Sequence, residues 1–209
     1  GPIKNLRTKL KTLTKITTGI AHTRWATHGE PILKNTHPHL SENISVVHNG
    51  IIENHIELRS LLKKKNYTFK SDTDSETISH LIHMYYKKSK NMETAVISTS
   101  KMLKGSYAIG CMNANYPNTI FAACNGSPLI IGKGKGENFI ASDITPILAD
   151  TKEFVTLTDS EFAKITPTEI LIFNSNKKKI NKVTKTSKVN SEQSSLSGHN
   201  HFMHKEIYE

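Results

Sequence analysis

The spacing of apolar residues changes at Gly105, and this change limits the chain to a fold with separate helices and sheets. Before Gly105, apolar residues recur at helical spacing in three segments, about 56–65, 73–86 and 92–103. After Gly105, short strand-like runs alternate with Gly, Pro, Asn or Asp. These runs are 106–112, 119–123, 129–131, 138–141, 153–157, 161–165 and 169–173. The pattern predicts an α+β fold with antiparallel sheets.

The two ends of the chain have a different character from this central part. A short helix is expected near residues 6–13, where three leucines recur in a basic segment. From Asn174 to Ser197 the sequence is rich in Lys, Ser and Thr, which predicts a final hairpin or a surface linker.

Length and composition favour one intracellular domain, or one domain with a small appendage. With 209 residues, 36% of them hydrophobic, the chain can bury one substantial core. No stretch approaches the roughly 18 consecutive apolar residues of a membrane helix, and the first residues lack a secretory signal. The two cysteines, Cys111 and Cys124, stand within apolar runs, which indicates buried thiols rather than a disulfide. We therefore expect a cytoplasmic protein without a membrane partner.

The net charge of +10 raises the possibility of a nucleic-acid partner. The lysine runs at 63–65, 87–88 and 177–179 are far apart and have no interleaved aromatic residues, which favours a solvated surface instead. A basic nucleic-acid-binding domain remains the alternative, and it predicts binding that depends steeply on salt concentration.

The segment from Thr18 to Pro31 has the composition of a binding loop. It contains an Arg, a Trp and two His between helix breakers, with no core-forming period. An exposed ion pair is the plain interpretation of Arg24, but its planar guanidinium is better suited to grip a carboxylate. This segment predicts a site for a small polar substrate.

Two further residues are candidates for the same site. Asn49-Gly50 ends a short apolar run and predicts a tight turn, in which Asn49 either shapes the turn or stabilises an oxyanion. Thr73-Asp74-Ser75-Glu76 is a capping-box pattern, so Asp74 caps a helix or holds a substrate ammonium group. Local pattern alone favours the cap.

Metal and phosphate sites are weakly indicated. His37-Pro38-His39 has no Cys or carboxylate at ligand spacing, and alternate residues of an extended segment point in opposite directions. The glycine-rich run 132–136 lies between two expected strands and lacks the Lys-Ser/Thr ending of a phosphate loop, so it predicts a hairpin. We expect neither a metal nor a cofactor.

Several motifs together resemble one known family. They are H-T-R-W-A-T-H-G-E-P, H-P-H, V-V-H-N-G-I-I-E-N, S-D-T-D-S-E and G-E-N-F-I-A-S-D. They resemble the class II, N-terminal-nucleophile glutamine amidotransferases, and among these the glutaminase domain of the glucosamine-6-phosphate synthase family. The resemblance implies an αββα four-layer sandwich with two antiparallel sheets. It also implies a glutaminase domain over residues 1–190 and the start of a linker to a sugar-isomerase domain over 191–209.

The resemblance also implies roles for individual residues. Arg24 would bind the α-carboxylate of L-glutamine and Asp74 its α-ammonium group. Asn49 and the Gly50 N–H would form the oxyanion hole. The remaining residues of the glutamine loop would be Trp25, Thr27, His28 and His37.

The family's nucleophile has no counterpart in this chain. That nucleophile is an N-terminal Cys whose own amino group acts as the base, whereas this chain opens at Gly1-Pro2. We therefore expect the chain by itself to lack glutaminase turnover, with a non-catalytic glutamine-binding module or another class II amidotransferase as the alternative. For the full-length enzyme, the resemblance implies transfer of ammonia to fructose 6-phosphate and a homodimer or higher oligomer.

Overall fold

The computed structural model describes residues 16–24 and 28–187, and within these ranges it contains the helices and strands that the sequence predicts. The helix expected near residues 6–13 and the linker 191–209 lie outside the described residues. The helical elements are η1 (Leu33–Asn35), α2 (His55–Lys63), α3 (Ser75–Ser89), α4 (Met92–Ser100) and η2 (Thr145–Ile147). The strands are β1 (His39–Ser41), β2 (Ile44–Ile52), β3 (Gly105–Asn113), β4 (Ile120–Asn125), β5 (Leu129–Lys133), β6 (Asn138–Ala141), β7 (Glu153–Leu157), β8 (Glu161–Ile165), β9 (Ile170–Phe173), β10 (Lys179–Ile180) and β11 (Lys185–Thr186).

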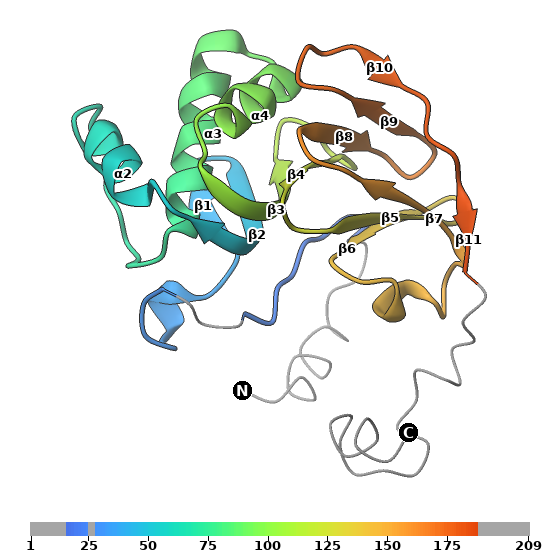
Figure 1. Cartoon of the computed structure of the whole chain (residues 1–209). Helices are drawn as coiled ribbons and strands as arrows, with labels where there is room; N and C mark the ends of the chain where they lie inside the picture. The colour runs from blue at the N-terminus through green and yellow to red at the C-terminus, as the bar shows by residue number, and fades with distance from the viewer. Residues whose placement is uncertain (1–15, 25–27, 188–209) are drawn as a thin grey trace.

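The strands form two antiparallel sheets (Figure 1). The larger sheet has the order β1-β2-β3-β4-β8-β9-β10, and the smaller has the order β11-β7-β5-β6. The glycine-rich run is the hairpin between β5 and β6, as predicted. The last two strands do not form a hairpin with each other, because β10 pairs with β9 and β11 pairs with β7. The predicted α+β fold with antiparallel sheets is therefore confirmed.

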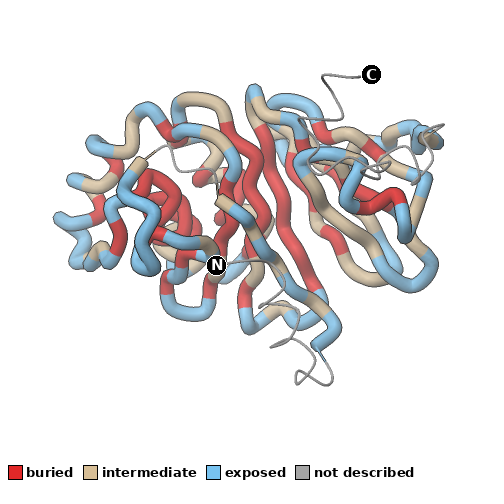
Figure 2. Tube along the Cα trace, turned by 90° about the horizontal axis from the view of Figure 1, so that it is seen from below, coloured by how far each residue is buried: buried red, intermediate tan, exposed pale blue. Residues whose placement is uncertain are grey.

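The three α-helices pack together on one side of the larger sheet (Figure 1). The buried face of α3 carries Ile78, Leu81 and Ile82, which are fully buried against β2 and α4 residues such as Val46 and Met92. Figure 2 shows the buried residues running along the central strands and into this helical layer. None of the helices in residues 16–24 and 28–187 is long and apolar enough to cross a bilayer.

A second apolar core lies between the two sheets. Ala108 and Ala122 of the larger sheet contribute to it together with Ile131 and Val155 of the smaller sheet. The sheets approach closely, since a Cβ atom added to Gly110 on β3 would come within 2.6 Å of the Ile140 side chain on β6. A larger residue at 110 would therefore require the Ile140 side chain to move.

Candidate functional site

A cavity of about 270 Å³ opens where β2 ends and α3 begins. Six of the eight predicted site residues line it, and the other two, Trp25 and Thr27, lie outside the described residues. The six come from the loop before β1, from β2 and from the start of α3. They are Arg24, His28, His37, Asn49, Gly50 and Asp74. Segments up to fifty residues apart in the sequence thus meet around one space.

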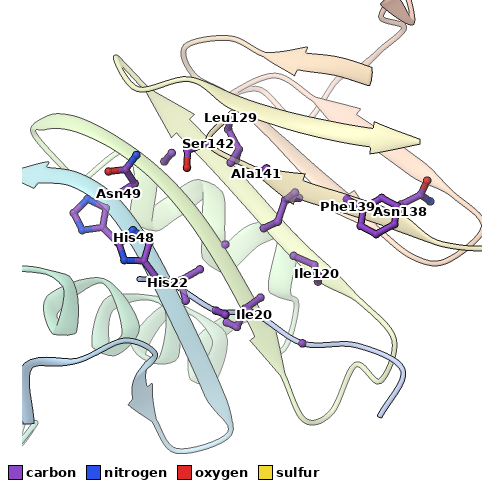
Figure 3. Close-up of a pocket in the computed structure, with 16 residues that line it drawn as sticks. Ile20, His22, His48, Asn49, Ile120, Leu129, Asn138, Phe139, Ala141 and Ser142 are labelled. Carbon is purple, nitrogen blue, oxygen red and sulfur yellow. The ribbon is translucent and has the colours of Figure 1, made fainter. Parts of the chain in front are cut away.

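A second cavity of about 230 Å³ adjoins the first one. Both are lined by His22, His48 and Asn49, so these three residues stand at the junction. Figure 3 shows His48 and Asn49 on one side of the second cavity and Leu129 and Phe139 of the smaller sheet on the other. Most of the residues that line the first cavity have charged or polar side chains, whereas most of those that line the second are apolar.

Asn49 and Gly50 lie within strand β2 and not in the tight turn that the sequence predicted. All nine residues of β2 pair with β3, with Asn49 opposite Ala108 and Gly50 opposite Tyr107. Long-range pairing has outweighed the local turn preference of Asn-Gly. Gly50 has a φ of +132°, and a Cβ atom there would lie 2.1 Å from the Ser106 carbonyl oxygen. Only glycine fits this close contact between the two strands.

The Asp74 carboxylate faces the cavity region and does not cap its helix, so the cap interpretation was wrong. Asp74 is only 3% exposed and makes no side-chain capping bond to α3. Its Oδ2 accepts a hydrogen bond of 2.8 Å from the Ile52 N–H on β2. A carboxylate at this position joins the end of β2 to the start of α3 and keeps its other oxygen close to the cavity.

The predicted capping box is also absent, because Glu76 bonds to the preceding loop. Its carboxylate accepts bonds from the Lys70 N–H at 2.8 Å, the Ser71 N–H at 2.7 Å and the Ser71 hydroxyl at 2.6 Å. Arg59 and His80 lie 3.9 and 3.5 Å away. Burial acts to raise the pKa of Glu76, but the interaction with His80 and the hydrogen bonds from Lys70 and Ser71 outweigh it and lower the pKa to about 2. The ionised carboxylate fixes the loop that leads into Asp74.

Arg24 has a left-handed backbone conformation, with a φ of 57°. Its guanidinium donates to three carbonyl oxygens of the loop that follows, those of His28, Gly29 and Glu30, at 2.8 to 2.9 Å. A guanidinium carries five N–H donors, so these three bonds leave two. Arg24 thus shapes the loop and still has donors for an anion in the cavity.

Histidines beyond the predicted ones surround the cavity. The ring of His37 lies 4.5 Å from that of His22 and 4.9 Å from that of His39. Burial is the main cause that lowers the pKa of His37 to about 3, and the neighbouring His22 adds to the effect. His22 and His48 line the cavity but were not predicted. Eight of the 11 histidines lie between His22 and His83, and this clustering was the available signal.

The two cysteines are buried, as predicted, and neither lines the cavity. Burial raises the pKa of both thiols to about 12, so they are protonated and weakly nucleophilic near neutral pH. Cys111 belongs to the core under the helices and Cys124 to the core between the sheets. Within the described ranges, no group of three or more His, Cys, Asp or Glu residues could hold a metal ion.

The arrangement of two facing antiparallel sheets is shared with solved structures of other proteins. The fold matches glutamine phosphoribosylpyrophosphate amidotransferase from B. subtilis, solved with ADP and GMP, with a TM-score of 0.60 at 23% sequence identity. The match covers 74% of this chain and 34% of that one. A family model described as a glutamine amidotransferase domain matches residues 22–149. The chain belongs to this glutamine amidotransferase family.

Within this family, the chain is similar to curated proteins that share one name. The chain is 46% identical over 192 residues to a glutamine–fructose-6-phosphate aminotransferase (isomerizing) of Salmonella paratyphi A. It is 49% identical over 193 residues to the protein of the same name from Wigglesworthia glossinidia brevipalpis. Each match covers 92% of this chain and 32% of the relative, so the chain spans about a third of the length of these relatives.

Proposed function

We propose that the cavity at the end of β2 binds L-glutamine and that the chain is the glutaminase part of an isomerizing glutamine–fructose-6-phosphate aminotransferase. The observation that carries the proposal is the convergence of Arg24, Asp74 and Asn49 on one cavity of about 270 Å³. A cation, an anion and an amide donor are the groups that an α-amino acid with a side-chain amide requires. The reaction in this proposal is that of the similar glutamine–fructose-6-phosphate aminotransferases.

Each residue has a chemical task in this proposal. The two remaining N–H groups of Arg24 bind the α-carboxylate, and the buried Asp74 carboxylate binds the α-ammonium group. The Asn49 side chain and the Gly50 N–H donate to the oxyanion of the tetrahedral intermediate that forms when a nucleophile attacks the amide carbon. Removing one such donor typically lowers kcat by about 10²- to 10³-fold.

The nucleophile is a thiol other than Cys111 and Cys124 in this proposal. Both thiols are buried away from the cavity with a pKa of about 12, so neither can attack a bound amide. We therefore expect the chain by itself to bind glutamine without releasing ammonia. In a protein that joins the chain to such a nucleophile, ammonia passes to fructose 6-phosphate in a cytoplasmic homodimer or higher oligomer.

Titration with L-glutamine, followed by NMR or calorimetry, tests the binding step. Asp74→Asn removes the charge that faces the ammonium group and should weaken binding at least tenfold. Asp150→Asn serves as the matched control and should leave the affinity unchanged, because Asp150 is exposed, lies between η2 and β7 and lines neither cavity. Equal affinities for the two variants, or no glutamine binding at all, would contradict the proposal.

A non-catalytic glutamine-binding module is the second candidate, and the inert state of both cysteines is the observation that favours it. Ammonia release separates the two candidates. In a protein that carries this chain together with a cysteine nucleophile, Asn49→Ala should slow ammonia release by about 10²-fold or more. Absence of ammonia release from that protein, with glutamine still bound, would favour the binding module.

A further inference from the structure

A line of hydrogen bonds runs from Asp74 to a histidine that has no assigned role. The Ser75 hydroxyl lies 3.4 Å from Asp74 Oδ1 and 2.9 Å from His48 Nδ1. Because the hydroxyl can donate one proton and accept another, it can donate to the Asp74 carboxylate and accept from His48 Nδ1–H. In this arrangement the other ring nitrogen of His48, Nε2, carries a lone pair.

The free nitrogen of His48 is buried in the site. The Nε2 atom is buried from solvent and has no hydrogen-bond partner among the described residues. The whole residue is 3% exposed. His48 lines both cavities, and Figure 3 shows it beside Asn49 at the second one. Burial lowers the pKa of His48 to about 4, so the ring is neutral near pH 7. A buried polar atom without a partner is costly unless a ligand satisfies it.

We propose that His48 Nε2 is a second acceptor for the α-ammonium group of the substrate, held in its acceptor form by Ser75. This inference rests on the proposed function, because it assumes that glutamine occupies the cavity. An ammonium group has three N–H donors, and both oxygens of Asp74 already accept a bond, Oδ2 from the Ile52 N–H and Oδ1 from the Ser75 hydroxyl. The lone pair of His48 Nε2, which lies in a residue that lines the same cavity, offers this ammonium group a further acceptor.

The test compares L-glutamine with 4-carbamoylbutanoate, which is the same molecule without the ammonium group. Both ligands are titrated into the chain and into His48→Asn, with NMR shifts as the readout. An Asn side chain is too short to reach the Nε2 position, although its amide can still bond to Ser75. We expect the dissociation constant for L-glutamine to rise by about 10-fold or more and that for 4-carbamoylbutanoate to change by less than about threefold.

Two further variants distinguish a specific role of His48 from a general disturbance of the structure. His83→Asn is the matched control, since His83 lies on α3 and bonds to Tyr67 away from both cavities, and it should change neither constant. Ser75→Ala keeps the His48 imidazole packed but removes the hydrogen bond that fixes which ring nitrogen carries the proton. It should weaken the binding of L-glutamine by about threefold or more and leave that of 4-carbamoylbutanoate unchanged. If His48→Asn does not fold, His48→Leu, which has no acceptor, takes its place, because Ser75→Ala also removes a bond to Asp74.

Each result has one meaning. Equal weakening of both ligands would assign His48 a structural role and overturn the inference, as would unchanged affinities. If the unsubstituted chain binds 4-carbamoylbutanoate but gains nothing from the ammonium group of L-glutamine, the inference fails while the cavity remains an amide site. If it binds neither ligand, the proposed function fails and the inference fails with it.

Discussion

Replacement of Glu76 by Gln removes one buried charge and leaves the shape of the side chain nearly intact. The Glu76 side chain is 4% exposed and accepts three hydrogen bonds from residues 70 and 71. A Gln amide keeps one acceptor oxygen, but its NH₂ group would face N–H donors. The variant should therefore lose stability and also loosen the loop before Asp74.

The size of the loss follows from the pKa of Glu76. The folded value of about 2 lies below the ordinary value of 4.5, so the folded state favours the ionised carboxylate. This gap corresponds to about 3 kcal/mol, at about 1.4 kcal/mol for each factor of ten in proton affinity. Because the folded pKa is depressed, this stability is present above about pH 4.5 and is lost as the pH falls toward 2. Glu76→Gln should lower the free energy of unfolding by about 2 to 3 kcal/mol at pH 7 and by much less near pH 2.

Urea unfolding followed by far-UV circular dichroism, at pH 7 and at successively lower pH, measures both effects. The matched control is Glu93→Gln, because Glu93 is 32% exposed and pairs with Lys164 at 3.4 Å on the surface. A surface ion pair contributes less than about 1 kcal/mol, so this control should differ little from the unsubstituted chain. Equal losses in the two variants at pH 7, or a loss for Glu76→Gln that does not shrink in acid, would refute the reasoning.

Two other substitutions test the local structure. Gly50→Ala should destabilise the chain by more than about 2 kcal/mol, because it adds a Cβ atom 2.1 Å from the Ser106 carbonyl oxygen at a positive φ. Urea unfolding measures this loss of stability. A smaller loss would mean that β2 shifts easily to make room for the methyl group. Asn91→Ala removes the side chain that accepts a 2.7 Å bond from the Thr94 N–H at the start of α4, and it should cost about 1 kcal/mol in the same assay. A neutral result there would show that packing alone fixes the helix start.

The elements of the fold were predictable because their signals are local. The helical spacing of Ile78 and Leu81 predicts the buried face of α3, and breakers separate the strands that follow Gly105. The errors concern residues whose partners are distant in the sequence. Asn49 and Gly50 pair across to β3, nearly sixty residues later, and this pairing places them inside a strand.

The same limit applies to the site. Thr73-Asp74-Ser75-Glu76 marks the helix start correctly, yet the bonds of Asp74 and Glu76 go to Ile52 and to the preceding loop. A local pattern can name the residues that stand at a helix end, but the three-dimensional fold decides which neighbours they bond to. His48 was missed for this reason, since its partner Ser75 lies 27 residues away.

Because β2 pairs with β3 along its whole length, the distances between positions on β2 are fixed. The Ile52 N–H holds Asp74, and Asn49 stands three residues earlier on the same strand. At about 3.3 Å per residue, these two positions are about 10 Å apart along the strand. With glutamine bound as proposed, the strand sets the spacing between the ammonium site and the amide site. Asparagine is shorter than glutamine by one methylene group, so with its ammonium group at Asp74 its amide would stop short of Asn49.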